Sequence, residues 1–388
     1  MSANTPPLDI VFYTEGLPFD GDSPERGALG GEQSAMCFLA RALAQMGHKV
    51  TAYIPCTSEA VSHGVLYKPY TMLDELIHRE CDVYVCSRYL LTFAKPLRAR
   101  VRILWLHQIL IEELNEYLTF LAPKMDIIYL LSDYQHRRSV QTLPELESKM
   151  RMLKLGITHP VIEQALAKTE GKKHKIMFTS RPERGLWEAL DIYEQLQDTK
   201  LEFLICTYPF PRVDSAGSVE ASCHRRIKSL VERGFPIETG MFNKADLYRH
   251  IAESKVVIYP CNIAEVFALS SLETQACGTV YLTYDEFCFT ELVSYKGIPF
   301  GDTAALTKRL KTLLWDTALR QELESQGRAH VQKYTWPKTA QTLVDAVYER
   351  LSLNATSTVL PRRNYDRRGL SVPLYSQPLA NILSAQIG

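Results

Sequence analysis

The sequence lacks net charge, and it lacks any segment suited to cross a membrane or to direct export. Its 388 residues include 44 lysines and arginines and 44 aspartates and glutamates, a balance that argues against a nucleic-acid-binding protein. No apolar run approaches the roughly 20 residues of a membrane-spanning helix. The first ten residues, MSANTPPLDI, have neither the basic nor the apolar part of a signal peptide. We expect a cytoplasmic protein that binds no nucleic acid, and we leave open a peripheral contact with a membrane.

Paired cysteines and common nucleotide-binding loops are also missing. None of the nine cysteines forms a C-x-x-C pair, so we expect reduced cysteines that serve as small hydrophobic side chains. The chain has no G-x-G-x-x-G dinucleotide fingerprint and no Walker A loop. A two-domain dehydrogenase is therefore disfavoured.

Short β-rich runs alternate with helical patterns over most of the chain. This alternation predicts doubly wound parallel sheets built from right-handed βαβ units, and several runs are apolar throughout, as is typical of strands covered on both faces. The expected strands are 8–13, 49–55, 82–86, 101–106 and 126–131, then 175–179, 201–206, 255–260 and 279–284.

The two series of strands predict two domains, which suits the length of the chain. We place the hinge at 156–173, where a proline and a polar run separate the series. The predicted domains are 1–165 and 166–336. An amphipathic helix is expected at about 337–352, and the tail 353–388, rich in Ser, Pro and Arg, is expected to be poorly ordered or packed on the surface.

The segment 265–273, with the sequence EVFALSSLE, follows an expected buried strand and leads into an expected helix, Leu269–Ala276. The helix N-terminus near Phe267–Leu269 would offer free N–H groups and the positive end of its dipole to a diphosphate. The carboxylates of Glu265 and Glu273 are suited to accept hydrogen bonds from sugar and ribose hydroxyls. The alternative is structural, with Glu265 as a helix cap and Glu273 on a solvated face.

The two glutamates, followed by the sequence TQACGT at 274–279, resemble the signature of the retaining GT-B glycosyltransferases, in particular of family 4. The resemblance implies an α/β fold of GT-B type, in which two Rossmann-like, doubly wound parallel-sheet domains face each other across a cleft. It implies that Glu265 contacts the donor sugar and that Glu273 contacts the ribose. Ala268 stands where the family usually has glycine, and alanine permits a close backbone approach at negative φ.

Two arginines, Arg181 and Arg184, follow the expected strand 175–179. Open α/β sheets bind ligands at this end of their strands, and two cations three residues apart can hold a diphosphate from two sides. The family resemblance places an arginine here and, before glycine, usually a lysine. Arg184 replaces that lysine, and its guanidinium can bind phosphate through two parallel hydrogen bonds. A solvated charged loop is the alternative.

Two weaker signals lie in the first half of the chain. Gly30 and Gly31 open an expected helix and resemble the family's glycine-rich loop, where backbone approaches the β-phosphate. The segment 14–29 before them is long for such a connection, so we expect it to contact the acceptor. His107 ends the expected strand 101–106, and the family carries a histidine at the matching strand end, near the donor sugar. The alternatives are a plain turn and a structural histidine.

Two further segments resemble parts of the same family. Met241 and Phe242 lie in a sequence, GMFN, that resembles the loop holding the nucleobase through backbone atoms. Residues 334–336, YTW, resemble the closing element after which the last helix returns to the first domain. Asp20 and Asp22 look like the metal-binding D-x-D of the other glycosyltransferase fold, but they lie in the first loop of a two-domain chain. We therefore expect no bound metal.

The resemblance implies a metal-independent glycosyltransferase that moves a sugar from a nucleotide-diphosphate sugar to a hydroxyl of a glycan, lipid or small molecule. No cofactor is expected, and Glu265 and His107 are the predicted catalytic residues. The arginines would stabilise charge on the leaving diphosphate, which would itself accept the acceptor's proton during front-face attack. Two alternatives stay open. One is an epimerase or phosphorylase of the same fold, and the other is a catalytically silent nucleotide-sugar-binding or scaffold protein.

Overall fold

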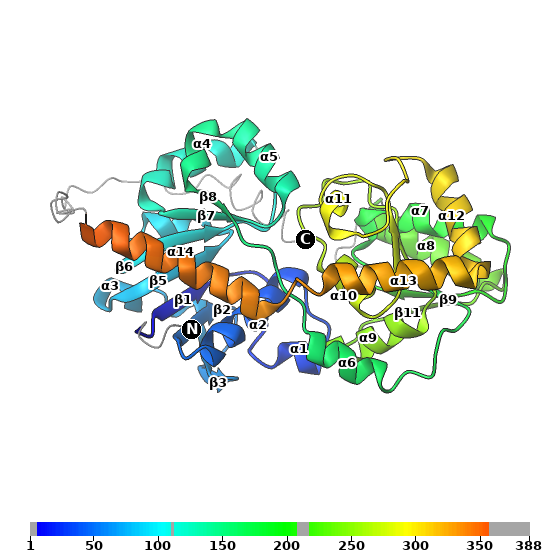
Figure 1. The fold of residues 1–388 in the computed structure, drawn as a ribbon, viewed down its shortest axis with the longest axis horizontal. Helices are drawn as coiled ribbons and strands as arrows, with labels where there is room; N and C mark the ends of the chain where they lie inside the picture. The colour runs from blue at the N-terminus through cyan, green and yellow to red at the C-terminus, as the bar shows by residue number, and fades with distance from the viewer. Residues whose placement is uncertain (1–5, 110–111, 208–216, 357–388) are drawn as a thin grey trace.

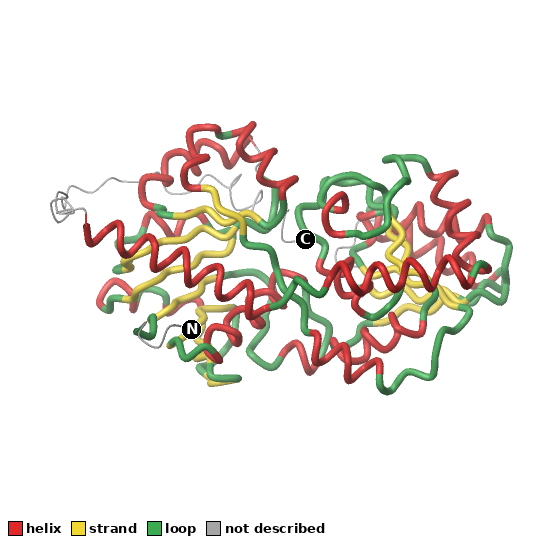
Figure 2. The backbone as a smooth tube through the Cα atoms, in the orientation of Figure 1, coloured by secondary structure: helices red, strands yellow, loops and turns green. Residues whose placement is uncertain are grey.

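A computed structural model describes residues 6–109, 112–207 and 217–356, which form two α/β domains side by side (Figure 1). Each domain is built around one sheet with helices on its faces (Figure 2). The strands of the N-terminal sheet are β1 (Asp9–Tyr13), β2 (Lys49–Ile54), β3 (Ala60–Ser62), β4 (Val65–Pro69), β5 (Cys81–Ser87), β6 (Ala99–Trp105), β7 (Ile127–Leu130) and β8 (Met150–Met152). The strands of the C-terminal sheet are β9 (Lys175–Thr179), β10 (Glu202–Cys206), β11 (Ile237–Gly240), β12 (Val256–Tyr259) and β13 (Val280–Thr283).

The order of the strands places a topological switch in each sheet. The N-terminal order is β3-β4-β2-β1-β5-β6-β7-β8, and the C-terminal order is β11-β10-β9-β12-β13. The pairs are parallel except for the β3–β4 hairpin. The chain leaves β1 toward β2 on one side of the sheet and later returns to β5 on the other side, and β9 lies in the same way between β10 and β12. Each such reversal opens a crevice at the carboxyl ends of the two strands that flank it.

Helices cover both faces of these sheets. Those that follow N-terminal strands are α1 (Ser23–Arg26), α2 (Gly31–Gln45), α3 (Glu75–His78), α4 (Glu112–Leu121) and α5 (Asp133–Thr142). The others are α6 (His159–Leu166), α7 (Leu186–Gln195), α8 (Val219–Glu232), α9 (Lys244–Glu253), α10 (Leu269–Ala276), α11 (Phe289–Leu292), α12 (Thr303–Trp315), α13 (Thr317–Val331) and α14 (Trp336–Thr356). Short 3₁₀ turns are η1 (Tyr70–Met72), η2 (Leu90–Ala94), η3 (Ala122–Lys124), η4 (Pro144–Lys149) and η5 (Pro182–Arg184).

Local sequence explains where the helices α2 and α10 end. The apolar side of α2 is buried at Ala35, Leu39 and Leu43, and the helix gives way at Gly47, whose φ is +90°. The helix α10 has the bounds that its sequence predicts and ends before Gly278, whose φ is +68°. Glycine adopts this left-handed backbone without strain, and it is therefore common just after a helix.

All nine expected strands are present, each within two residues of its expected ends. The analysis of periodicity missed β3, β4, β8 and β11. The strands β3, β8 and β11 are short edge strands, and β4 lies inside the sheet but has only two buried residues among its five. The two residues between β3 and β4, His63 and Gly64, form the turn of a hairpin. They have φ of +49° and +79°, the backbone typical of a two-residue hairpin.

The chain crosses between the domains twice, and the two crossings lie side by side. The N–H of Ile157 donates to the carbonyl of Tyr334 at 3.2 Å, and Ile157 also forms a parallel bridge with Thr335. A Cβ at Gly156 would lie 2.2 Å from the backbone nitrogen of Trp336. Glycine is thus required there, because the crossings touch through their backbones.

After the second crossing, α14 returns to the N-terminal domain, as expected (Figure 1). Trp336 stacks on Phe38 of α2, and Arg350 pairs with Asp126 at 3.1 Å. The helix is longer than predicted and runs on to Thr356, so the first residues of the expected tail are helical. Residues 357–388 lie outside the described residues.

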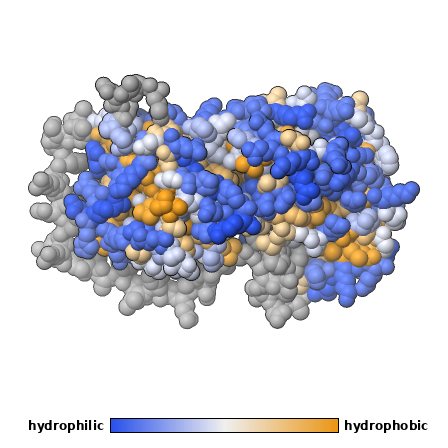
Figure 3. Space-filling view, turned by 90° about the horizontal axis from the view of Figure 1, so that it is seen from below, coloured by the Kyte–Doolittle hydropathy of each residue, from blue (hydrophilic) through white to orange (hydrophobic). Residues whose placement is uncertain are grey.

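The expected hinge at 156–173 is not a plain linker, because it contains α6, which packs on α9. The division at residues 165 and 336 itself stays a prediction. No helix in the described part of the chain combines the length and apolar character of a membrane span. The face shown in Figure 3 is largely hydrophilic, and its apolar residues gather in small separate areas.

Candidate active site

A pocket of about 590 Å³ lies between the two domains, at the carboxyl ends of their strands. Residues from both domains line it, including five from the segment 14–29. The structure brings every predicted site residue to this one pocket: Gly30, Gly31, His107, Arg181, Arg184, Met241, Phe242, Glu265, Phe267, Ala268, Leu269 and Glu273. Their chemical roles remain predictions.

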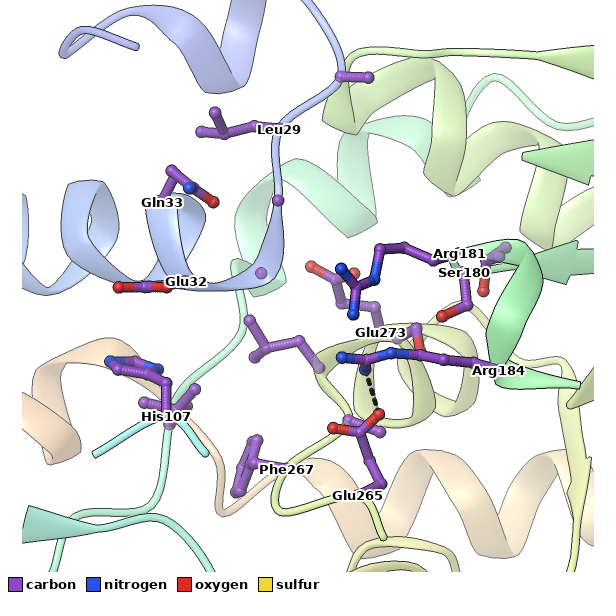
Figure 4. A pocket seen from close by; sticks show the side chains of 18 of the residues that line it. Leu29, Glu32, Gln33, His107, Ser180, Arg181, Arg184, Glu265, Phe267 and Glu273 are labelled. Carbon is purple, nitrogen blue, oxygen red and sulfur yellow. Dashed lines mark hydrogen bonds and ion pairs between the residues drawn. The ribbon is translucent and has the colours of Figure 1, made fainter. Parts of the chain in front are cut away.

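Arg184 and Glu265 form an ion pair in the centre of the pocket (Figure 4). Arg184 follows β9 and Glu265 follows β12, so the switch between these neighbouring strands places them opposite each other. Burial opposes the charge of Arg184, but the Glu265 carboxylate and the neighbouring Tyr259 and Cys261 together raise the pKa of the guanidinium. Gly185 fixes the turn after Arg184: its φ is +99°, and a Cβ there would lie 2.1 Å from the carbonyl oxygen of Pro260.

Glu265 is held by a second contact and does not cap a helix. The hydroxyl of Tyr259 donates to its Oε2 at 3.3 Å, and a hydrogen bond of 3.2 Å joins that hydroxyl to Ser180. Burial raises the pKa of Tyr259, which keeps the phenol protonated as a donor. The N-cap of α10 is Ala268, which has no side-chain cap, so the structural alternative for Glu265 is wrong in that form.

Glu273 is buried rather than solvated, with 5% of its surface exposed. Its Oε1 accepts hydrogen bonds from Lys244 Nζ at 2.6 Å and from the hydroxyl of Tyr248 at 2.7 Å. Both donors come from α9, one helical turn apart. We did not single out Lys244 and Tyr248 from the sequence, although their i, i+4 spacing behind the helix cap Asn243 was an available signal.

Two helix N-termini face the pocket, one from each domain. The N-caps are Gly30 for α2 and Ala268 for α10, and neither helix has a side-chain cap. A Cβ at Gly31 would touch only Leu269 Cδ1, at 3.8 Å, so protein packing does not require glycine there. Ala268 has φ of −99°, and alanine is therefore unstrained where the family usually has glycine. Uncapped N–H groups at both helix ends suit an anion.

On the N-terminal side, His107 lies beside a partly buried ion pair between Glu32 and Arg88 (Figure 4 labels His107 and Glu32). Burial lowers the pKa of His107 to about 4, although the nearby Glu32 carboxylate opposes this shift. The imidazole is therefore neutral at pH 7, and its Nε2 has no hydrogen-bond partner among the described residues. Such a group can exchange hydrogen bonds with a bound hydroxyl.

Arg88 ties together three segments that line the N-terminal side. Its Nη1 donates to Glu32 Oε2 at 2.6 Å, and its Nε and Nη2 donate to Gln108 Oε1 at 3.0 and 2.8 Å. Glu32 also accepts from Ser87 at 2.5 Å and from Thr14 at 3.3 Å. The φ of Arg88 is +70°, a strained backbone of the kind that clusters at functional sites. Sequence analysis missed Arg88, since only strand adjacency brings it to Glu32.

Asp20 and Asp22, the two carboxylates of the D-x-D sequence, lie outside the pocket. Asp20 pairs with Arg26, and Asp22 accepts from Ser62. In the part of the chain that the structure describes, the side chains placed to share an ion are the exposed Asp22, Glu25 and His63.

Comparison with known proteins finds a family match within the second half of the chain and a short similar segment in one characterised enzyme. Residues 164–330 match the family model of the glycosyl transferases group 1. A segment of 96 residues is 38% identical to D-inositol 3-phosphate glycosyltransferase of Jonesia denitrificans, and it covers 24% of this chain and 22% of that protein.

Solved structures resemble nearly the whole chain. Sucrose-phosphate synthase of Thermosynechococcus elongatus has a TM-score of 0.69 at 16% identity, with 89% of this chain and 99% of that chain covered. HepE of Anabaena, solved with UDP-glucose, has a TM-score of 0.68 at 14% identity, with coverages of 88% and 100%. The fold is GT-B, as the sequence implied, and the comparisons support a glycosyltransferase.

Proposed function

We propose that the protein is a retaining, metal-independent glycosyltransferase that moves a hexose from a nucleoside diphosphate sugar to a hydroxyl acceptor. The observation that carries this proposal is the pocket itself, in which Arg181, Arg184 and two uncapped helix N-termini meet the carboxylates of Glu265 and Glu273. The acceptor is a glycan, lipid or small molecule, and the proposed location is the cytoplasm.

The C-terminal side of the pocket supplies what a nucleoside diphosphate needs. Arg181 and Arg184 can bind the diphosphate together with the N–H groups at the start of α10. Lys244 and Tyr248 hold one oxygen of Glu273, which fixes the carboxylate so that its second oxygen can accept from the ribose. The backbone at Met241 and Phe242 borders the same pocket and is the proposed edge of the nucleobase site.

The reaction breaks the bond between the anomeric carbon and the diphosphate oxygen. The acceptor oxygen forms the new bond to that carbon on the same face, and its proton passes to the departing diphosphate. The arginines and the helix N-termini stabilise the negative charge that gathers on the leaving group. Glu265 lies beside Arg184 and is the proposed contact of the donor sugar, while neutral His107 binds a sugar hydroxyl from the opposite domain.

UDP-glucose is the first donor to test, because the similar HepE structure holds it. The protein is incubated with UDP-glucose and a panel of hydroxyl acceptors, and the product is examined by proton NMR. An α-linked product from the α-linked donor supports the proposal. A β-linked product overturns retention, and tight UDP binding without transfer or hydrolysis favours the silent binding protein.

A further inference from the structure

The N-terminal side of the pocket carries few charged side chains, and negative charges outnumber positive ones. Among the described residues, the ionisable side chains that this domain contributes are Glu15, Glu32, Arg88, Tyr89 and His107. With His107 neutral, two carboxylates stand against one guanidinium. In the proposed function the donor occupies the C-terminal side, so these groups surround the acceptor.

Arg88 is the one cation among these side chains, and it is already hydrogen-bonded within the protein. Its donors are directed at the Glu32 carboxylate and at the Gln108 side chain. The backbone of Gln108 is itself held, because its main-chain carbonyl oxygen accepts from Gln135 Nε2 at 2.8 Å. Arg88 cannot turn toward a new anion without breaking this network.

Drawing Arg88 away would also isolate Glu32. Burial disfavours the charge of Glu32, but the Arg88 guanidinium, together with the other groups around the carboxyl, keeps its pKa below the ordinary value. A buried charge that loses its partner is strongly destabilising. A phosphate on the acceptor could therefore pair with Arg88 only if the Glu32 carboxylate lost Arg88 as its partner.

Glu15 adds a second reason to exclude an anion. It lies at the start of the loop after β1, and its Oε1 accepts from the hydroxyl of Tyr13 at 2.6 Å. Among the described residues, no lysine or arginine forms an ion pair with Glu15. A phosphate near Glu15 would meet a like charge, and unpaired or repelling charges are an effective means of rejecting a ligand.

The remaining cationic side chains that line the pocket lie on the side proposed to bind the donor. Arg181, Arg184 and Lys244 come from the C-terminal domain. Arg184 and Lys244 are paired with Glu265 and Glu273, and in the proposed function the arginines bind the diphosphate. They would not be available to a second phosphorylated substrate bound at the same time.

We infer that the acceptor is an uncharged, hydroxyl-rich molecule, a sugar or polyol, and that the pocket rejects its phosphorylated counterpart. This inference rests on the proposed function. The carboxylate of Glu15 and the amides of Gln33 and Gln108 offer the hydrogen-bonding groups that hydroxyls need, without a net positive charge.

Matched acceptor pairs test the inference. The probes are glucose with glucose 6-phosphate and myo-inositol with myo-inositol 1-phosphate. Binding to UDP-saturated protein is followed by saturation-transfer NMR, and transfer from UDP-glucose is assayed in parallel. We expect the uncharged member of at least one pair to bind or react at least tenfold better than the phosphorylated member. Glu15→Lys should shrink that ratio at least tenfold, and Glu15→Gln should shrink it less.

The control is Glu232→Lys, the same charge change at an exposed site on α8, which should keep the wild-type ratio. Preference for the phosphorylated members, binding of neither class, or an unchanged ratio in folded Glu15→Lys would overturn the inference. Such results alongside normal UDP binding would leave the donor side of the proposed function intact. Failure of UDP and UDP-glucose to bind the wild-type protein would overturn both.

Discussion

The carboxylate of Glu291, in the C-terminal domain, caps a helix of the N-terminal domain: its Oε1 accepts the backbone N–H of Asp133, the first residue of α5, at 2.6 Å. Its Oε2 accepts from Lys154 Nζ at 2.7 Å. Beside this contact, the rings of Tyr134 and Phe287 meet edge to face with centroids 5.5 Å apart. The domains are thus joined by side-chain contacts in addition to the two crossings of the chain.

The Glu291 contact gives a testable prediction about domain closure. Glu291→Ala removes a helix cap and an ion pair, so it should lower stability by about 0.5–2 kcal/mol, the range for lost caps. Small-angle scattering should show a larger radius of gyration without donor. Glu286→Ala, at an exposed site on the loop before α11, is the matched control. An unchanged melting temperature and scattering curve for Glu291→Ala would show that this contact does not hold the domains.

Arg184→Ala should weaken binding of UDP by about 1.5–3 kcal/mol, the value of a charge-assisted hydrogen bond, or roughly ten- to hundredfold in Kd. The variant should also be less stable, because the buried Glu265 loses its partner. Calorimetry measures the affinity. Arg226→Ala, which removes an ion-paired arginine of α8 outside the pocket, should bind UDP normally. Wild-type affinity in folded Arg184→Ala would remove this residue from the donor site.

The two carboxylates should differ in their kinetic effects. Glu273→Gln should mainly raise the donor KM, because a ribose contact is made equally in the ground and transition states. Glu265→Gln should mainly lower kcat. It should leave UDP affinity unchanged or higher, since it frees the Arg184 guanidinium from its partner. Steady-state kinetics and calorimetry on both variants decide this, and normal turnover in folded Glu265→Gln would end its catalytic assignment.

His107 predicts a dependence of stability on pH. Its pKa is lowered to about 4 by burial, from an ordinary value near 6.5, so the unfolded chain binds the proton more readily than the folded protein. The contribution is complete above about pH 6.5 and is lost as the pH falls toward 4. Thermal melts between these values should show a shallower slope in His107→Gln than in the wild type. An NMR titration of His107 with a midpoint above 6 would contradict the prediction.

Chelation should leave activity intact, because two arginines and two helix N-termini supply positive charge in the pocket. Turnover of UDP-glucose is measured before and after treatment with EDTA. Asp22→Asn, outside the pocket, should behave as the wild type in both conditions. Loss of activity with EDTA, and its recovery on addition of manganese, would overturn metal independence.

The expected strands were found because a buried parallel strand leaves a local trace in the sequence, an apolar run before a turn. The edge strand β11 leaves no such trace, since its residues are half-exposed or exposed. The extent of α14 was underestimated for a similar reason. Its last turns follow no strong apolar pattern, and the helix is held by contacts with distant residues, such as Arg350 with Asp126.

The site was predictable where one short segment carries several groups. Glu265 and Glu273 flank the start of α10, and Arg181 and Arg184 follow one strand, so local sequence placed each pair. The ion pairs between these segments were not predictable in the same way. Arg184 meets Glu265, and Arg88 meets Glu32, only because the order of the strands makes their ends neighbours.

The paired crossings at Gly156 and Trp336 have a consequence for protein engineering. Since α14 packs on the N-terminal domain, the C-terminal domain is an internal insert of the chain and not its second half. Consider a chimera of this chain with a second protein of the same fold, joined at a single point near residue 156. It would pack α14 of one parent against α2 of the other. Grafting a different donor specificity therefore calls for two junctions, one at each crossing, with the backbone contact between Gly156 and Trp336 taken from the same parent.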